Sequence, residues 1–149
     1  MNRISSSLPA ARLLLLLLPL FWALSACDNK RDHNGDLGGM WQLTEWRSPD
    51  GTTLATKEDQ IFYSVQLNLI RFRDYNDGTW GDYYLAYFRH TPDSLIVYRP
   101  VNYAKDSLVS LQDLARYGVP ADGGFRIDAL SDDMMILRSS AGTINFRKY

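Results

Sequence analysis

The sequence predicts an all-β fold: a small antiparallel barrel or sandwich of seven or eight short strands with one short helix. Three observations predict it. Short segments of alternating apolar and polar residues recur at roughly even spacing from residue 39 onward. Clusters of Pro, Gly, Asp, Asn and Ser separate these segments and are typical of tight turns. Only one segment has helical spacing, and no internal repeat is visible.

The chain begins with an apolar segment that has the features of an export signal. A positively charged start precedes a nearly unbroken apolar run over Leu13–Leu24. As a helix, about a dozen residues span only ~18 Å, whereas the bilayer core is ~30 Å thick. The run ends in Leu-Ser-Ala-Cys27, the order of residues in a lipobox. We therefore expect residues 1–26 to be a lipoprotein signal peptide, with lipid on the Cys27 thiol; the alternative is a plain secreted protein.

Composition limits the remaining possibilities. The chain has 16 basic and 17 acidic residues; without Arg3 and Arg12 of the signal, 14 against 17 leave a formal net charge of −3. No basic cluster indicates nucleic-acid binding. The only cysteine is Cys27, so the core alone must stabilise the exported domain. We expect one domain in the bacterial cell envelope, lipid-anchored to a membrane and facing the periplasm or the cell surface. The outer membrane of a Gram-negative cell is the favoured location.

Residues 27–38 are expected to be the lipidated N-terminus and a flexible tether. The stretch Asp28–Gly38 has no apolar period and is rich in Asp, Asn and Gly. Fully extended, it would span ~35–40 Å. His33 lies in this stretch and is expected to be a solvated linker residue without a metal. The folded domain is expected over residues 39–149.

Alternation and turn residues predict the elements of this domain. The pattern predicts strands over residues 40–46, 61–72, 83–90, 95–98, 125–129, 134–138 and 143–149. In the second of these, the apolar face changes near Ile70, which we interpret as a bulge or a strong bend. A short helix over Ser107–Tyr117 is expected between strands four and five. Its cap would be Asp106 or Ser107, and Gly118 would end it.

Two segments resemble the lipocalins. Gly39-Met40-Trp41 resembles the G-x-W opening of that family, and 143–149 resembles the last strand of small bacterial lipocalin-like domains. The resemblance covers residues 39–149 and implies a lipocalin-like β-barrel. It also implies that Trp41 closes one barrel end, with a basic side chain from near the C-terminus packed over the ring. Arg147 is the first candidate for that side chain and Arg138 the second. Typical lipocalins carry their helix after the last strand.

The sequence contains no pattern that indicates catalysis or a metal site. No G-x-S-x-G nucleophile motif occurs, and His33 and His90 are far apart. The loop at 74–78 resembles a calcium loop, but its spacing is one residue short. We expect no enzyme activity, no cofactor and no metal.

Aromatic residues crowd the middle of the chain and suggest a ligand pocket. Tyr83, Leu85 and Tyr87 have the same strand parity, and phenols can supply the few polar contacts of an apolar site. The candidate pocket residues are Tyr83, Leu85, Tyr87, Tyr98, Leu108 and Leu111. The alternative is that these side chains only fill the pleats of the sheet.

Two functions follow. The first is a membrane-anchored lipocalin-like lipoprotein that binds a small apolar or amphipathic molecule in the barrel. Such a ligand is expected to be neutral or weakly polar and to enter opposite Trp41. The second is a cavity-free barrel that acts as an interaction module in an envelope protein assembly, with a filled interior and an exposed apolar patch.

Overall fold

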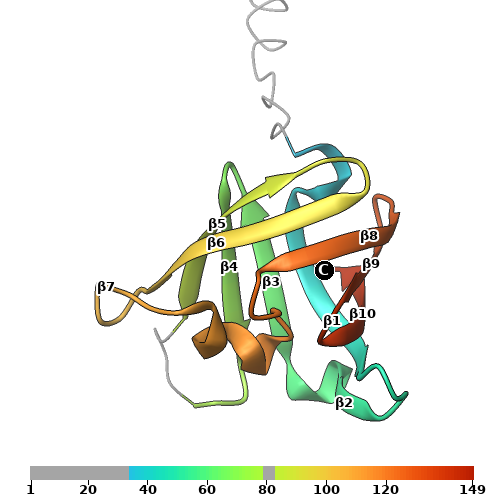
Figure 1. Cartoon of the computed structure of the whole chain (residues 1–149), viewed down its shortest axis with the longest axis horizontal. Coiled ribbons are helices and arrows are strands. Elements are labelled where there is room, and N and C mark those ends of the chain that lie inside the picture. Colours follow the sequence, from blue (N-terminus) through green and yellow to red (C-terminus); the bar gives the residue numbers. More distant parts are fainter. Residues whose placement is uncertain (1–33, 79–82) are drawn as a thin grey trace, which may run out of the picture. The chain divides into compact units, whose positions relative to one another are not determined.

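The computed structural model describes residues 34–78 and 83–149, which form a closed antiparallel β-barrel (Figure 1). The predicted signal peptide, Cys27 and the first part of the tether lie outside the described residues. In chain order the elements are η2 (Gly35–Leu37), β1 (Gly39–Arg47), β2 (Thr53–Thr56), η3 (Lys57–Asp59), β3 (Ile61–Gln66), β4 (Leu69–Asp74), β5 (Tyr84–His90), β6 (Ser94–Asn102), β7 (Ser107–Leu108), η4 (Leu111–Tyr117), β8 (Gly124–Leu130), β9 (Met134–Ser139) and β10 (Gly142–Lys148).

Eight strands make the barrel, in the order β10-β9-β8-β6-β5-β4-β3-β1. The last strand closes it, because β10 pairs with β1 from Trp41 opposite Lys148 to Arg47 opposite Thr143. On its other side β1 pairs first with β3 and then, beyond Leu43, with the short β2. β7 is a two-residue addition to the end of β6. The predicted all-β barrel is confirmed.

The segment predicted as one strand over 61–72 forms two strands, so the prediction of a bulged single strand was wrong. β3 and β4 make a hairpin in which Gln66 pairs with Leu69. Leu67 takes the left-handed conformation (φ 54°) that such a tight turn requires. The change of apolar face near Ile70 therefore marks a reversal of the chain. It raises to five the number of barrel strands that precede the helix.

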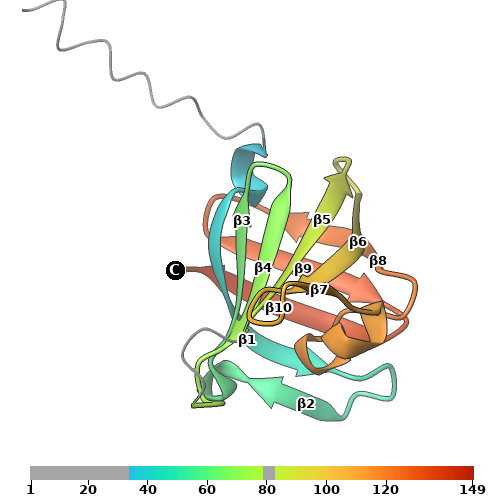
Figure 2. The same cartoon turned by 90° about the vertical axis from the view of Figure 1, so that its left-hand side faces the viewer.

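The helical segment is shorter than expected and begins later. Ser107 belongs to β7, and η4 starts after Ser110, which forms a capping box with Asp113. Gly118 ends the helix in the left-handed conformation, as predicted. Leu114 and Tyr117 are its buried residues, whereas Leu108 is 68% exposed. η4 lies at the end of the barrel opposite η2 and the β3–β4 turn (Figure 2).

Part of the predicted tether is folded. η2 precedes the barrel, and its Leu37 is fully buried in the core. Asn34 is also buried, and its side-chain amide donates a hydrogen bond to the Leu67 carbonyl (2.7 Å). Residues 34–38 therefore belong to the barrel domain, because an apolar anchor and a buried amide tie them to it.

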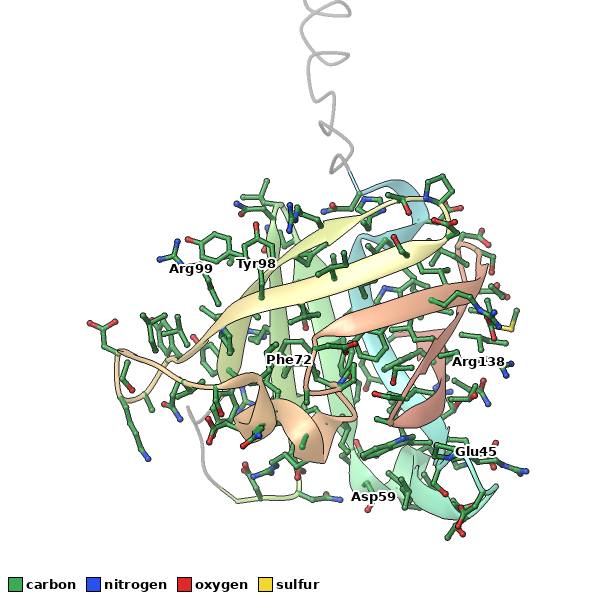
Figure 3. All side chains as sticks on the ribbon, in the orientation of Figure 1. Glu45, Asp59, Phe72, Tyr98, Arg99 and Arg138 are labelled. Carbon is green, nitrogen blue, oxygen red and sulfur yellow. The ribbon has the colours of Figure 1, made fainter. Side chains whose placement is uncertain are left out.

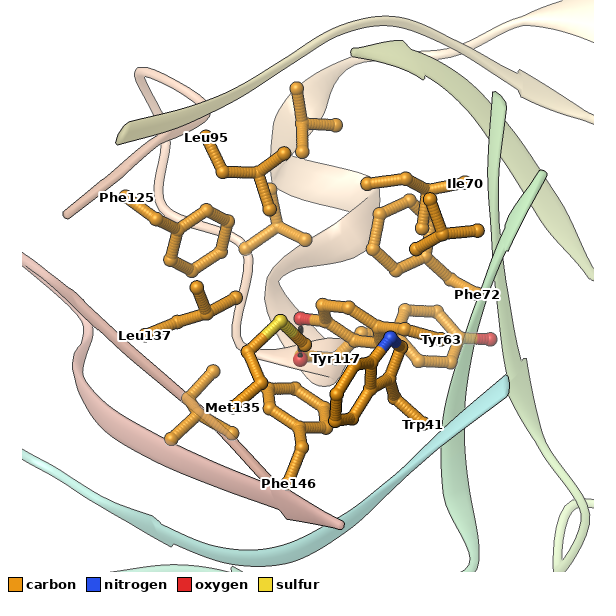
Figure 4. Packing of buried hydrophobic residues seen from close by; sticks show 14 of the residues in the cluster. Trp41, Tyr63, Ile70, Phe72, Leu95, Tyr117, Phe125, Met135, Leu137 and Phe146 are labelled. Carbon is orange, nitrogen blue, oxygen red and sulfur yellow. Dashed lines mark hydrogen bonds between the residues drawn. The ribbon is translucent and has the colours of Figure 1, made fainter. Parts of the chain in front are cut away.

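The side chains that point into the barrel form one apolar core. Several of them converge at the centre of the barrel (Figure 4). The largest fully buried strand residues are Trp41, Leu43, Tyr63, Ile70, Phe72, Leu95, Met135, Leu137 and Phe146. Aromatic contacts link them, with the ring of Tyr63 4.6 Å from Phe72 and 4.7 Å from Phe146. Within residues 34–78 and 83–149, none of the helices has the length and apolar character needed to cross a bilayer.

Candidate functional site

One end of the barrel is closed around Trp41. Its ring is fully buried, and its indole N–H donates to the Leu37 carbonyl (2.8 Å). The Lys148 ammonium lies 4.4 Å from the ring centroid and donates to the Asp36 carbonyl (2.7 Å). Gly39 has φ 114°, and a Cβ there would lie 2.9 Å from Lys148 Cε. A glycine two residues before the tryptophan therefore leaves room for the cation that covers the ring.

The cation over Trp41 is Lys148, which corrects the expectation for Arg147. Because Phe146 points into the barrel, Arg147 points outward and donates twice to Gln42 Oε1 (2.9 and 2.6 Å). Arg138, the second candidate, pairs with Asp128 on the outer surface (2.6 Å). Strand parity counted from Phe146 was the signal that could have identified Lys148.

η4 closes the other end of the barrel. The Tyr63 hydroxyl, buried among apolar side chains, donates to the Tyr117 carbonyl (2.7 Å). Burial raises the pKa of Tyr63 far above its usual value and that of Tyr117 to about 12. Both phenols are therefore neutral at physiological pH. Arg116 fixes η4 from outside through Asp74 (2.7 Å) and Asp77 (3.4 Å).

With both ends closed, the clearest concave site of the described residues lies on the outer face of the barrel. A cleft of about 300 Å³ runs across β3, β4 and the start of β5. It combines three apolar side chains with four that can form hydrogen bonds: Leu67, Leu69, Leu85, Ser64, Gln66, Arg71 and Tyr83. We call this the outer cleft. Another cleft of about 300 Å³ is separate from it and is lined by uncharged side chains: Met40, Gln60, Phe62, Tyr75 and Tyr149.

Arg71 is the charged group of the outer cleft. Within residues 34–78 and 83–149, its one hydrogen bond is a long one to the Ser64 hydroxyl (3.4 Å), and its Nε is buried without a hydrogen-bond partner. The guanidinium lies 5.6 Å from the ring centroid of Tyr83, which in turn stacks on Tyr103 at 4.5 Å. Burial, with Tyr103 as the next cause, raises the pKa of Tyr83 above its usual value, so its phenol remains a donor. The cleft can therefore bind an anionic group beside an apolar wall.

Next to the outer cleft, β5 and β6 carry a second aromatic cluster. Tyr87 and Tyr98 stack with centroids 6.0 Å apart. Arg89 lies 5.3 Å from the Tyr98 centroid, and Arg99 lies 5.9 Å from that of Tyr87. Figure 3 shows Tyr98 and Arg99 on the outside of the barrel, whereas Phe72 lies inside it.

The predicted pocket residues thus fall into three groups. Tyr83 and Leu85 line the outer cleft, and Tyr87 and Tyr98 form the cluster beside it. Leu108 is exposed on β7 and Leu111 packs against the core, so neither is among the residues that line the cleft. Sequence reasoning missed Ser64, Gln66 and Arg71, because their role depends on the β3–β4 hairpin. Among the described residues, no group of His, Cys, Asp and Glu is arranged to hold a metal ion.

Comparisons with known proteins agree with this architecture. A family model described as a lipocalin-like domain matches residues 22–149. The solved structure of a lipocalin-like protein from Bacteroides uniformis is 22% identical, with a TM-score of 0.59, and the match covers 77% of this chain and 100% of that one. An uncharacterized protein from Bacteroides eggerthii is 23% identical, with a TM-score of 0.56, over 75% and 98% of the two chains. No curated protein sequence matches significantly. The chain belongs to the family of lipocalin-like domains.

Proposed function

We propose that this chain is a lipid-anchored lipoprotein of the bacterial envelope that binds a small amphipathic ligand in the outer cleft. The observation that carries the proposal is the location of free space. The barrel interior is filled by its own core, whereas the outer cleft offers about 300 Å³ beside an incompletely satisfied guanidinium. That volume is at the lower limit for small-molecule sites.

The anchor is inferred from the sequence. The run over Leu13–Leu24 is too short to span a bilayer and ends directly before the lipobox order Leu-Ser-Ala-Cys27. Several acyl chains anchor a protein stably, at ~0.8 kcal/mol per buried CH₂. Replacement Cys27→Ala is expected to abolish lipid attachment and processing at that position. Mass spectrometry of the native protein tests this; an unmodified mature N-terminus beyond residue 27 would refute it.

The chemistry of the cleft revises the expected ligand. The sequence predicts a neutral ligand because it shows no buried, unpaired charge that could bind a ligand carboxylate. Arg71 is such a group, since its partly buried guanidinium has no carboxylate partner among the described residues. Leu69 and Leu85 provide the apolar wall beside it. The proposed ligand therefore has an anionic head, a carboxylate or a phosphate, and a short apolar part.

A displacement titration with a fluorescent fatty acid tests this proposal. Replacement Arg71→Gln removes the charge and most donors and is expected to weaken binding about 10- to 100-fold, the usual value of a charged hydrogen bond. Arg126→Gln is the matched control, because it removes an exposed arginine from β8. Equal affinity of both variants for the fatty acid would refute the outer-cleft site.

A second candidate function is an interaction module within an envelope protein assembly. It is favoured by the filled interior together with large apolar side chains exposed on the outer face, of which Leu67 is 66% exposed and Tyr87 36%. A stable complex recovered from envelope extracts by the wild type, and lost on Tyr87→Ala without loss of fatty-acid binding, would establish this alternative.

A further inference from the structure

The nine arginines of the described residues differ in their partners: Arg71 and Arg73 lie over the rings of Tyr83 and Tyr75, and Arg147 binds Gln42. Four pair with carboxylates at 2.6–2.8 Å: Arg47, Arg116, Arg126 and Arg138. Arg89 and Arg99 instead lie over the rings of Tyr98 and Tyr87 and have no carboxylate partner among the described residues. The domain has more acidic than basic residues. Even so, the positive charges of Arg89 and Arg99 are not neutralised by a carboxylate of the described residues, and both lie on one surface. That surface is complementary to an anionic partner.

Contact with the tyrosine rings leaves these guanidinium groups able to bind anions. A cation–π contact uses none of the N–H donors of a guanidinium, so these donors remain available for phosphate or carboxylate oxygens. The rings of Tyr87 and Tyr98 are themselves stacked 25° from parallel, so the four side chains form one assembly. The nearby β5–β6 turn carries Asp93, whose carboxylate accepts a hydrogen bond from the Thr91 hydroxyl (2.6 Å) and, among the described residues, makes no ion pair with Arg89 or Arg99.

Apolar side chains surround this assembly on the same outer face. Ile96 pairs with Arg89 across β5 and β6 and is 40% exposed. Leu69 pairs with Tyr87, and the adjoining turn residue Leu67 is 66% exposed. Leu67, Tyr87, Arg89, Ile96, Tyr98 and Arg99 together form what we call the arginine–tyrosine patch. Arginine, tyrosine and aliphatic side chains are the combination that suits the interface between lipid headgroups and acyl chains.

The chain enters the barrel beside this patch. Asn34, the first described residue, donates to the carbonyl of Leu67, a member of the patch (2.7 Å). Only seven residue steps separate Asn34 from Cys27, so the intervening chain spans at most about 25 Å. A lipid on Cys27 therefore holds this end of the barrel, and not the η4 end, close to the bilayer.

We infer that the arginine–tyrosine patch docks on the membrane that carries the anchor, with Arg89 and Arg99 binding phosphates of anionic lipid headgroups. This inference rests on the proposed lipidation of Cys27. Leu67 and Ile96 reach the apolar boundary, and Tyr87 and Tyr98 lie at headgroup level. The outer cleft, which shares Leu67 with the patch, then opens beside the lipid surface.

The test uses the lipidated full-length protein on vesicles with and without phosphatidylglycerol. The native thiol is acylated, so a single fluorophore can be placed by Asn68→Cys in the β3–β4 turn or by Ser140→Cys at the opposite end. Brominated lipids are expected to quench the residue-68 probe about twofold or more above the residue-140 probe, and only on anionic vesicles. The double variant R89Q/R99Q is expected to abolish this difference. The control R126Q/R138Q removes the same charge from β8 and β9, where both arginines pair with Asp128, and is expected to retain the difference.

The outcomes separate the two claims. Vesicle flotation with equal quenching of both probes would overturn docking and leave the anchor intact. Failure of the protein to float with vesicles would overturn the anchor and the docking together. In intact cells, a photocross-linker at residue 68 that captures an envelope protein in place of lipid would also overturn membrane docking.

Discussion

Three residues decide how the Trp41 end of the barrel is closed. Trp41 fills the barrel end, Lys148 covers its ring at 4.4 Å, and Gly39 leaves the space for the Lys148 side chain. The ammonium also satisfies the Asp36 carbonyl, so the cation–π contact and the hydrogen bond act on one side chain. Removing the ring should therefore cost more than removing the cation.

The first prediction compares these two changes. Trp41→Ala deletes a fully buried indole and is expected to lower the free energy of unfolding by ~3–5 kcal/mol. Lys148→Met keeps the aliphatic stem and is expected to cost ~0.5–2 kcal/mol. Urea unfolding measures both. Arg138→Met serves as the surface control at about 0–1 kcal/mol, and a Trp41→Ala loss below ~1 kcal/mol would contradict burial of the ring.

The second prediction concerns alkaline pH. The pKa of Tyr117 is raised to about 12 and that of Tyr63 is raised further, whereas an unfolded tyrosine titrates near ~10. The folded state therefore retains protons that the unfolded state loses. This stabilisation is fully present below ~pH 10 and declines as the pH rises toward the folded pKa values.

The variant Tyr63→Phe separates this effect from packing. At pH 7 it is expected to cost ~1–3 kcal/mol, because the Tyr117 carbonyl loses its buried donor. Above pH 10 the stability of this variant should fall less steeply than that of the wild type. Thermal unfolding across pH 7–11 measures both; parallel pH profiles would contradict the assignment.

At the scale of elements, the barrel depends on the turns that join its strands. The β9–β10 turn lies against the end of β1, and a Cβ on Gly142 would lie 1.9 Å from the Arg47 carbonyl oxygen. Gly51, in the β1–β2 turn, also has positive φ (89°), but a Cβ there would meet nothing within 4 Å. The two glycines therefore separate backbone strain from steric overlap.

The third prediction uses this pair. Gly51→Ala is expected to cost only the strain of the left-handed conformation, ~1–2 kcal/mol. Gly142→Ala adds a clash with backbone that cannot move aside without breaking the β10–β1 closure, so its cost should be clearly larger. Urea unfolding of both variants checks the order, and equal costs would contradict the closure geometry.

Element prediction from the sequence succeeded where one physical signal dominated. Gly118, and the turn at 91–93, are found where their conformational preferences indicated. The β3–β4 hairpin was missed because Leu67 and Asn68 carry no glycine signal, although Leu67 takes positive φ. Tertiary pairing, which sequence alone does not reveal, holds that turn.

It was harder to predict from the sequence which face of a strand points into the barrel. In β5, Leu85 and Tyr87 alternate with Ala86 and Phe88, so both faces are apolar or aromatic. The parity was correctly predicted, but only the closed barrel places Ala86 and Phe88 inside and Tyr87 outside. The candidate site was therefore half visible in the sequence: Tyr83 and Leu85 were found, and Arg71 was not.

At the scale of the whole molecule, the core and the binding surfaces are on opposite sides of one sheet. Inward side chains fill the barrel, and η2 with Trp41 and η4 close its ends. The outward side chains of β3–β6 carry the cleft and the arginine–tyrosine patch. The central claim is that the barrel is a packed support for an outer binding face.

Leucine-methyl NMR during titration with a short-chain alkyl phosphate or carboxylate tests that claim most directly. Leu67, Leu69 and Leu85 report on the outer cleft, whereas the fully buried Leu43, Leu95 and Leu137 report on the interior. The account predicts saturable shifts and ligand contacts at the outer three, with the affinity lowered about 10- to 100-fold by Arg71→Gln and the inner three unchanged. Ligand contacts to the inner methyls would contradict it and place the site inside the barrel.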